Sequence, residues 1–358
     1  MAKIERKIIL DILDLARYAP SGDNTQPWRF KINTDCSVSI YNVPERDTSL
    51  YNTNKKAALF AHGALIETIA IAATHWQLKT HITTYPPYDG DKIADVSFGI
   101  DTTLTEDPLF PMIKKRATNR KPFTSKPLTQ REKDFLLNES GPTGYSDLKF
   151  IEDSENKAIV AEAFSMNEQI LFENTHLHNF LFDHVRWSKE EVRKTLDGFS
   201  IKTFELPLPG KVMFKLASKE NRLAFMNKIM HFSEIIPKQT AKNYKASAEI
   251  GVLVASKRSR ESFLEGGRTI QRFWLATTKL GLGFQPLSGI IFLKHRILDQ
   301  QGDKLSSKEQ QIVEKAYHML ENAFETTGKY LVFGFRIGYG EEPSANTLRI
   351  PIEKLLIR

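Results

Sequence analysis

Two stretches of this chain, residues 63–78 and 267–282, share a pattern at a spacing of 204 residues. They agree at the pairs Gly63/Gly267, Ile66/Ile270, Ala72/Ala276, Thr74/Thr278 and Leu78/Leu282. Two ordinary amphipathic helices could also reach this agreement. Phe30 and Phe150 mark a second pair, at a spacing of 120. Because an internal repeat decides the fold, we expect two fused half-repeats, with about 84 extra residues in the second, near 176–240.

Hydrophobic spacing predicts a mixed α+β fold. Apolar residues at helical spacing predict helices over residues 5–18, 57–76, 129–138 and 269–280. Short apolar runs rich in β-branched and aromatic residues predict strands over residues 28–32, 38–43, 94–100, 147–152, 250–255 and 330–337.

The composition allows a large core and suits an anionic partner. With 41% hydrophobic residues among 358, the chain can form one large domain or two fused ones. A net charge of +7 suits a phosphate-bearing cofactor, a nucleotide or nucleic acid, and it is also typical of an ordinary solvated surface. The single cysteine, Cys36, excludes an internal disulfide and a thiol metal cluster.

The apolar stretches predict a soluble protein with no membrane partner, and the single cysteine fits a reducing cytoplasm. Residues 1–19 carry charges among their apolar positions and no small-residue cleavage site, which favours an amphipathic helix over a signal peptide. Residues 57–76 form the longest apolar stretch. His62, Glu67 and His75 interrupt it, so we expect a core helix there.

Several chemistries have no support in the sequence. The histidines 176, 178, 184 and 231 lack the spacing of metal ligands, so we expect no metal site. The motifs G-x-S-x-G and HExxH and the P-loop are missing, which gives no support to nucleophilic, zinc-dependent or nucleotide hydrolysis. The aromatic residues do not follow a basic face as in an RNA reader, so we expect no nucleic-acid partner.

Residues 19–28, Ala-Pro-Ser-Gly-Asp-Asn-Thr-Gln-Pro-Trp, close the first helix and lead into a strand. Proline, serine, glycine and asparagine favour a sharp bend of the backbone at this point. Their small side chains leave room for a flat ligand to approach the main chain. The turn is therefore a candidate ligand contact.

Residues 114–123, Lys-Lys-Arg-Ala-Thr-Asn-Arg-Lys-Pro-Phe, form a basic run. Arg116 and Arg120 stand four residues apart with Thr118 midway, so two guanidinium groups and a hydroxyl can converge on one phosphate. The same run could also be a solvated surface, a targeting address or a nucleic-acid patch.

Two further segments lie near the C-terminus. Residues 281–289, Gly-Leu-Gly-Phe-Gln-Pro-Leu-Ser-Gly, follow the second repeat helix, where glycines are typical helix caps. Their spacing is not that of a dinucleotide fingerprint. Thr347 and Arg349 follow closer to the end, where an arginine can equally be an ordinary surface residue.

Together these segments resemble the nitroreductase family of FMN-dependent enzymes. The turn at 19–28 is similar to the family's APSxxNxQPW signature, and 116–120 to the R-x-S/T-x-R/K element that binds the flavin phosphate. Residues 286–289 look like the loop whose main-chain N–H reaches flavin N5, and Arg349 like the basic residue that returns to the phosphate. The resemblance implies an α+β nitroreductase-like fold, with a mostly antiparallel central sheet flanked by helices. It implies these cofactor-binding residues: Pro20, Ser21, Gly22, Asn24, Arg116, Ala117, Thr118, Arg120, Pro286, Leu287, Ser288, Gly289, Thr347 and Arg349.

The two halves, residues 1–111 and 112–358, keep different parts of this pattern. The first half keeps the turn but has no R-x-S-x-R element. The second keeps the arginines, but its own turn, residues 140–145, lacks the Asn and the Gln-Pro-Trp. The resemblance therefore implies a fused pair that mimics the family's homodimer and forms one flavin site, as in the tandem Acg-type branch from mycobacteria. Residues 176–240 would then be a lid or an extra helical hairpin.

The resemblance also implies an activity. A reduced nicotinamide, NADH or NADPH, would pass a hydride through flavin N5 to a small electron-poor acceptor such as a nitroaromatic or a quinone. This chemistry requires no protein nucleophile, so we assign no catalytic side chain. The alternatives are a flavin-storing protein with little turnover and a flavin-dependent dehydrogenase of a peptide or heterocycle. A monomer that acts as a pseudo-dimer is expected.

Overall fold

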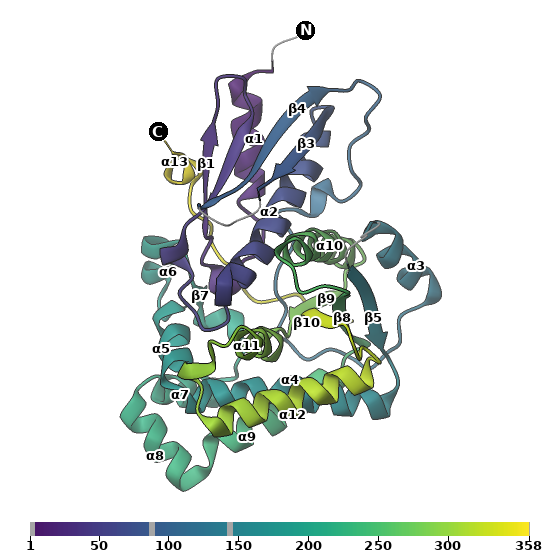
Figure 1. The fold of residues 1–358 in the computed structure, drawn as a ribbon. Coiled ribbons are helices and arrows are strands. Elements are labelled where there is room, and N and C mark those ends of the chain that lie inside the picture. Colours follow the sequence, from purple (N-terminus) through teal and green to yellow (C-terminus); the bar gives the residue numbers. More distant parts are fainter. Residues whose placement is uncertain (1–3, 86–89, 142–145, 358) are drawn as a thin grey trace.

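The computed structural model describes residues 4–85, 90–141 and 146–357 of the chain (Figure 1). The first part holds helices α1 (Arg6–Ala16) and α2 (Lys56–Thr74) and strands β1 (Trp28–Ile32), β2 (Val38–Asn42), β3 (Leu78–Thr84) and β4 (Lys92–Ile100). These strands form one sheet in the order β1-β2-β4-β3, in which all neighbours are antiparallel. One helix precedes the first two strands and another separates them from the last two.

The second part repeats this plan with α3 (Gln130–Glu139), β5 (Ser146–Ile151), β8 (Glu249–Ala255), α10 (Arg260–Lys279), β9 (Gly283–Pro286) and β10 (Tyr330–Gly338). Its sheet has the order β5-β8-β10-β9, again with antiparallel neighbours. When the strands of each sheet are counted in chain order, both sheets read first, second, fourth, third. Two sheets of the same topology therefore replace the single central sheet that we expected.

Long segments separate the strands of the second sheet. Between β5 and β8 lie α4 (Ser154–Glu173), α5 (Thr175–His184), α6 (Lys189–Thr195), α7 (Leu208–Ala217), α8 (Glu220–Met230) and α9 (Phe232–Lys245), with the short parallel pair β6 (Val185–Arg186) and β7 (Phe199–Ser200). We call residues 152–248 the insert. It begins before residue 176, where we expected the extra residues to start, because α4 already follows β5 directly. Helices α11 (Gly289–Leu298) and α12 (Ser307–Ala323) lie between β9 and β10.

The C-terminal residues return to the first sheet. Figure 1 shows α13 (Ile352–Leu355) beside β1. Leu356 forms a parallel bridge with Phe30, and the Ile357 N–H donates to the Phe30 carbonyl at 2.7 Å. Residues 346–350, which precede α13, are thereby carried to the first half.

Most predicted elements are present with small shifts at their ends. Strand β1 matches its predicted range, whereas α10 begins at Arg260 rather than at residue 269. Strands β3 and β9 were not predicted. The predicted turn at 140–145 falls mostly on residues 142–145, which lie outside the described residues.

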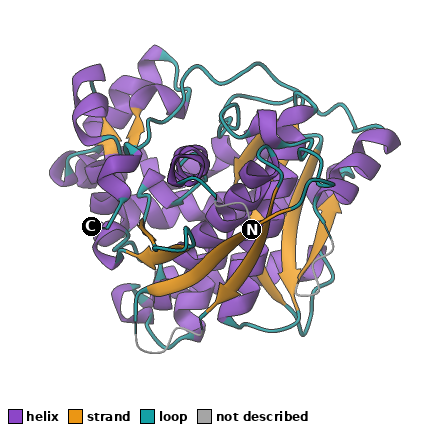
Figure 2. Cartoon of the chain, turned by 90° about the horizontal axis from the view of Figure 1, so that it is seen from above, coloured by secondary structure: helices purple, strands orange, loops and turns teal. Residues whose placement is uncertain are grey.

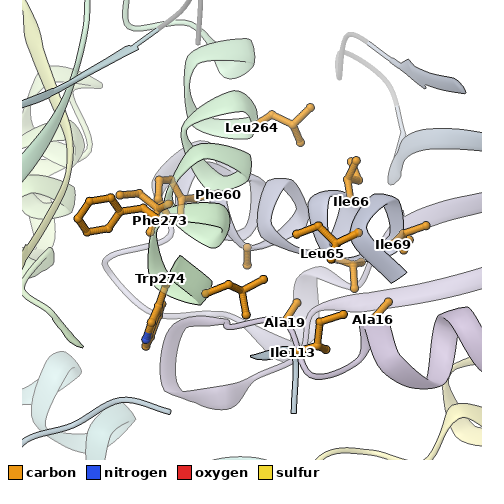
Figure 3. Close-up of a cluster of buried hydrophobic side chains, with 14 of the residues drawn as sticks. Ala16, Ala19, Phe60, Leu65, Ile66, Ile69, Ile113, Leu264, Phe273 and Trp274 are labelled. Carbon is orange, nitrogen blue, oxygen red and sulfur yellow. The ribbon is translucent and has the colours of Figure 1, made fainter. Parts of the chain in front are cut away.

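Helices α2 and α10 pack against each other at the centre of the molecule (Figures 1 and 3). Helices lie around and between the strands (Figure 2). A Cβ placed on Gly63 would lie 1.8 Å from the carbonyl oxygen of Leu264, and one on Gly267 would lie 2.0 Å from that of Phe60. The contact is reciprocal, because both glycines and both carbonyl residues are 204 positions apart. Glycine is thus required on both helices for their backbones to touch.

A second pair of contacts across this junction is reciprocal in the same way. Arg272 Nη1 lies 3.2 Å from Glu67 Oε1, and Gln271 Nε2 donates to Thr68 Oγ1 at 2.9 Å. Glu67 and Gln271 are 204 residues apart in the sequence, as are Thr68 and Arg272. The spacing of the two similar stretches is therefore also the spacing of the contacts between them.

Helix α2 is a core helix, as the sequence indicates. Together with the turn before it, Thr53–Thr74 is long and apolar enough to cross a membrane by composition, with a mean hydropathy of 1.6. Of its most apolar window, 83% is buried inside the molecule. Leu65, Ile66 and Ile69 are buried there, in the same hydrophobic cluster as Leu264 of α10 (Figure 3).

The first prediction concerns the α2–α10 contact. Gly63→Ala and Gly267→Ala should each lower the free energy of unfolding by about 1–3 kcal/mol, because the added methyl group meets backbone that cannot move aside. Urea unfolding followed by circular dichroism measures this loss. Gly99→Ala is the control, since the nearest atom to its Cβ would be 3.9 Å away. Alanine is otherwise the better helix former, so a gain in stability at either helix glycine would contradict the contact.

Candidate functional site

A cavity of about 540 Å³ lies where the two sheets' helices, the insert and the C-terminal segment meet. All fourteen residues predicted to bind a cofactor line it: Pro20, Ser21, Gly22, Asn24, Arg116, Ala117, Thr118, Arg120, Pro286, Leu287, Ser288, Gly289, Thr347 and Arg349. The structure therefore brings together four segments that are far apart in the sequence. The volume of the cavity is within the usual range of small-molecule sites.

Apolar side chains form much of the wall. Helix α2 contributes Phe60 and Ala64, and α10 contributes Ile270 and Trp274. The insert adds further apolar and aromatic residues, namely Phe164, Leu171, Leu177, Phe180, Leu181 and Phe199. The close α2–α10 contact thus also sets the position of one side of the cavity.

The turn that closes the first helix has a strained backbone. Asp23, Asn24 and Gln26 have φ values of 47°, 54° and 49°, in the left-handed region that non-glycine residues rarely adopt. The Gln26 N–H donates to Ser21 Oγ at 2.9 Å, and the Gln26 side chain accepts from the Ile350 N–H at 2.9 Å. These contacts hold the bend. The conformational freedom of Gly22 is not what permits it.

The side chain of Asn24 is fully engaged by the protein. Its Nδ2 donates to the carbonyls of Gly198 and Leu348 at 3.1 and 3.0 Å, and its Oδ1 accepts from Arg349 Nη1 at 2.8 Å. Asn24 therefore joins the turn to the insert and to the C-terminal segment. It positions Arg349 and has no free amide donor to offer a ligand in this arrangement.

Arg116 and Arg349 converge on one carbonyl. The Nη2 atoms of both donate to the Tyr18 oxygen, at 2.9 Å from Arg116 and 3.4 Å from Arg349. Both residues are buried, with 7% and 8% exposure, and their Nε atoms have no hydrogen-bond partner. Neither forms an ion pair within the described ranges of the chain. Burial lowers the pKa of Arg349 to about 10, and burial together with repulsion from Arg349 lowers the pKa of Arg116 well below its usual value.

Other groups add to this cationic end of the cavity. The Arg116 guanidinium lies over the Trp274 ring at 4.4 Å, and Lys114 Nζ lies 5.6 Å from the centre of the Tyr18 ring. Thr347 Oγ1 accepts from Arg349 Nη1. Two buried positive charges side by side, without a carboxylate, are costly unless an anion balances them.

Arg120 has different neighbours. Its Nη1 donates to the Thr203 carbonyl at 3.2 Å, and its guanidinium lies over the rings of Phe199 and Phe204 at 5.5 and 5.3 Å. Burial lowers its pKa, against the attraction of Asp23. The insert therefore holds Arg120 at a different part of the wall from the Arg116 and Arg349 pair.

The loop at 286–289 is fixed by β10 and α4. Ser288 Oγ donates to the Gly334 carbonyl and accepts from the Gly334 N–H, both at 3.1 Å, and the Leu287 N–H donates to the same carbonyl at 2.7 Å. A Cβ on Gly289 would lie 2.0 Å from Asn167 Oδ1. A side chain at position 289 would therefore displace the Asn167 amide from its present place. The N–H groups of the first turn of α11 have no partner within their own helix.

Three carboxyl groups line another part of the wall, and burial raises the pKa of each. Asp47 has a pKa of about 6 and Glu168 of about 7, while the pKa of Asp23 is also raised. Glu168 Oε1 accepts from the Tyr244 hydroxyl at 2.9 Å, and Glu168 Oε2 is buried without a partner. The site therefore has a cationic end and three carboxyl groups whose pKa values are raised by burial.

Some of these residues are not predicted from the sequence. Asn167, Glu168 and Tyr244 belong to α4 and α9 of the insert, for which we predicted no elements. A signal for α4 exists, because Asp153 caps the helix by accepting from the Asn156 N–H at 2.9 Å. Among the described residues, no group of three or more His, Cys, Asp or Glu side chains is arranged to hold a metal ion.

Comparisons with known proteins add little at the level of sequence. No family model and no curated protein matches the chain. It is similar to the solved structure of a nitroreductase-like protein from Bacillus cereus, with 15% identity, a TM-score of 0.36 and coverage of 70% of this chain and 95% of that one. The structure of the FMN-dependent nitroreductase NfnB from Mycobacterium smegmatis, in complex with NADPH, has 12% identity and a TM-score of 0.38. The match covers 68% of this chain and 94% of that one. A BluB-like flavoprotein from Clostridium difficile has 14% identity and a TM-score of 0.37, and the match covers 70% of this chain and 97% of that one. Likenesses this distant carry no argument about the site.

The second prediction concerns Glu168 and pH. The folded carboxyl has a pKa of about 7 against an ordinary value of 4.5, so between these values the folded state holds a proton that the unfolded state lacks. The free energy of unfolding should therefore fall as the pH rises through this window. Glu168→Gln should remove that fall, and its stability relative to the natural chain should rise by roughly 1 kcal/mol or more between pH 5 and pH 8.

Denaturant unfolding across this pH range measures the difference between the two proteins, in which the contribution of Asp47 cancels. Glu162→Gln, on the exposed side of the same helix, is the matched control. Stability curves for Glu168→Gln and the natural chain that run parallel would show that Glu168 ionises normally.

Proposed function

We propose that this chain is an FMN-dependent oxidoreductase, built as a fused pair of nitroreductase-like halves that hold one flavin between them. The observation that carries the proposal is the pair Arg116 and Arg349, which are buried together and have unpartnered Nε atoms. Among the described residues, no carboxylate forms an ion pair with either of them. Arginine forks bind phosphate oxygens bidentately. A doubly charged phosphate ester would balance this pair, and the residues present fit the phosphate of FMN.

Two observations support the fused-pair arrangement, with residues 1–111 and 112–358 as the halves. Both sheets have the same strand order and the same placement of helices. The α2–α10 contact is also reciprocal, as in a symmetric homodimer, where residue i of one copy contacts residue j of the other and the reverse. A monomer would then contain the interface that a homodimer builds from two chains.

The same spacing explains why one cavity would suffice. Ala61 and Ala64 of α2 line the cavity, and the positions 204 residues later are Glu265 and Arg268. These two residues form an ion pair at 3.2 Å, and Arg268 also pairs with Glu67 at 2.9 Å. In the second half, the positions that correspond to the cavity-lining alanines therefore carry charges that balance one another. We therefore propose one flavin per chain.

The chain's own groups would have these tasks. Arg116, Arg349, Thr118 and Thr347 would hold the phosphate, and Arg120 would place positive charge elsewhere on the wall. The apolar side chains of Phe60, Trp274 and their neighbours exclude water. Burial raises the pKa of Glu168 to about 7, so this carboxyl would take up and release a proton near neutral pH. When bound, FMN would supply hydride transfer from NADH or NADPH to a small electron-poor acceptor, such as a nitroaromatic or a quinone.

One observation favours a second candidate, a flavin-storing protein with little turnover. The insert is tied to the cavity wall by the Asn24 and Arg120 bonds described above and by Gln26 Nε2, which donates to the Leu196 carbonyl at 2.9 Å. Ser344 of the C-terminal segment also donates to Glu205, at 2.6 Å. Residues 196–205 thereby cover part of the cavity, which would limit access for a second substrate.

The third prediction tests the phosphate site. Arg116→Met should weaken FMN binding by at least about tenfold, because a charge-assisted hydrogen bond is lost. It should leave the stability of the flavin-free protein unchanged or raised, because a buried unbalanced charge is removed. Fluorescence titration with FMN and thermal unfolding measure the two effects. Arg131→Met, at an exposed position of α3, is the control. Unchanged FMN affinity in Arg116→Met would refute the assignment.

The fourth prediction separates the enzyme from the storage protein. With FMN bound, anaerobic NADPH or NADH should bleach the flavin spectrum, and a nitroaromatic or quinone should restore it. Stopped-flow absorbance measures both steps. The contrary outcome is a bound flavin that stays oxidised with both nicotinamides and is then reduced when dithionite is added to the same cuvette. That outcome would favour storage over turnover.

A further inference from the structure

Exposed apolar side chains are concentrated on one part of the insert. Seven of the fourteen large apolar side chains that are exposed among the described residues lie between residues 208 and 235: Leu208, Val212, Leu216, Phe225, Ile229, Met230 and Ile235. This stretch is less than a tenth of the chain. Scattered exposed apolar residues are normal, whereas a concentration marks an interaction surface.

Each of the three helices exposes an apolar side while burying another. On α7, an exposed apolar residue recurs every four positions and forms one stripe: Leu208, Val212 and Leu216. Phe214 of the same helix is buried against other residues of the insert. On α8, Phe225 and Ile229 are 63% and 60% exposed, four residues apart. Helix α8 contacts both α7 and α9. Figure 1 shows the three helices at the end of the molecule opposite the N-terminus. We call the exposed sides of α7, α8 and α9 the α7–α9 face.

A longer segment around these residues has a net charge close to that of the whole chain. Residues 202–245 contain nine basic residues, Lys202, Lys211, Lys215, Lys219, Arg222, Lys228, Lys238, Lys242 and Lys245. They contain only three acidic residues, Glu205, Glu220 and Glu234, so their net charge is +6, against +7 for the whole chain. In the part of the chain that the structure describes, none of these nine cations forms an ion pair. The α7–α9 face is therefore positively charged and not neutralised.

The charge also indicates where an anionic group could lie. A hollow of about 670 Å³ between α4 and α9 has Lys238, Lys242 and Lys245 on its wall, together with Lys315, Glu162 and Glu234. Ile235 precedes Lys238 and Lys242 on α9 by three and seven residues, which places the three on one side of the helix. A basic hollow thus adjoins an exposed apolar side chain.

We propose that the α7–α9 face docks on the surface of an anionic phospholipid bilayer. The apolar side chains would enter the boundary between headgroups and acyl chains, and the lysines would contact the anionic headgroups, as in interfacial amphipathic helices. Nucleic acid would match the charge but not the exposed leucine, phenylalanine and isoleucine side chains. A second copy of the chain would bring together two segments that each have a net charge of +6. The proposal does not depend on the bound cofactor.

This inference revises the expectation of no membrane partner, which was based on the search for a spanning segment. A docking surface on helices that are partly buried leaves no such segment in the sequence. The inner leaflet of a cell membrane is anionic. The cytoplasm that we expect for this chain would therefore offer the proposed partner.

The test is flotation of the purified full-length chain with two kinds of vesicle, one of phosphatidylcholine and one of equal parts phosphatidylcholine and phosphatidylglycerol. Binding to the anionic vesicles should exceed binding to the neutral ones by about tenfold or more and should weaken in high salt. Phe225→Ser/Ile229→Ser and, separately, Lys219→Gln/Lys228→Gln should each reduce binding to the anionic vesicles by about tenfold.

The control is Ile100→Ser/Leu137→Ser, at positions that are 51% and 49% exposed in other parts of the molecule, and it should bind like the natural chain. All changed side chains are exposed, and circular dichroism checks that each variant is folded. No flotation, or equal flotation with both vesicles, would overturn the proposal. So would a dimer that Phe225→Ser/Ile229→Ser dissociates without vesicle binding, or tight binding to duplex DNA that this variant retains.

Discussion

The backbone contact between α2 and α10 determines where the rest of the molecule lies. Gly63 and Gly267 leave no room for a side chain, since a Cβ on either would lie within about 2 Å of a carbonyl oxygen on the other helix. This contact places Phe60 and Ala64 next to Ile270 and Trp274 in one wall. The C-terminal segment then carries Arg349 back to the turn at Asn24.

Charge distinguishes the two sides of that contact. On one side, Arg268 and Arg272 pair with carboxylates, among them Glu67 and Asp107, so positive and negative groups balance within the protein. On the other side, Arg116 and Arg349 both donate to the Tyr18 carbonyl. The other hydrogen-bond acceptors of Arg349 are also neutral. Two guanidinium groups that are buried at a cavity without a balancing carboxylate are costly, and an anion would lower that cost. This asymmetry is the physical basis of the proposed single flavin site.

The sequence predicts much of this arrangement, and its failures have physical reasons. Helical and strand periodicity identified α1, α2, β1 and β8, because each buries one face or both. Periodicity does not say which strands share a sheet, so one sheet was expected where there are two. It also does not show contacts made by polar side chains in a helix, which is why Glu168 of α4 was missed. The resemblance to the nitroreductase family singled out Arg116 and Arg349, and both line the cavity. It did not reveal that the Asn24 side chain is occupied by Gly198, Leu348 and Arg349.

The most direct measurement of the central claim compares FMN with riboflavin, which has the same ring system and no phosphate, in calorimetric titrations of the flavin-free chain. If Arg116 and Arg349 await a phosphate, one FMN should bind per chain, at least about a hundredfold more tightly than riboflavin. Equal affinity for the two flavins, or two FMN molecules per chain, would contradict the account.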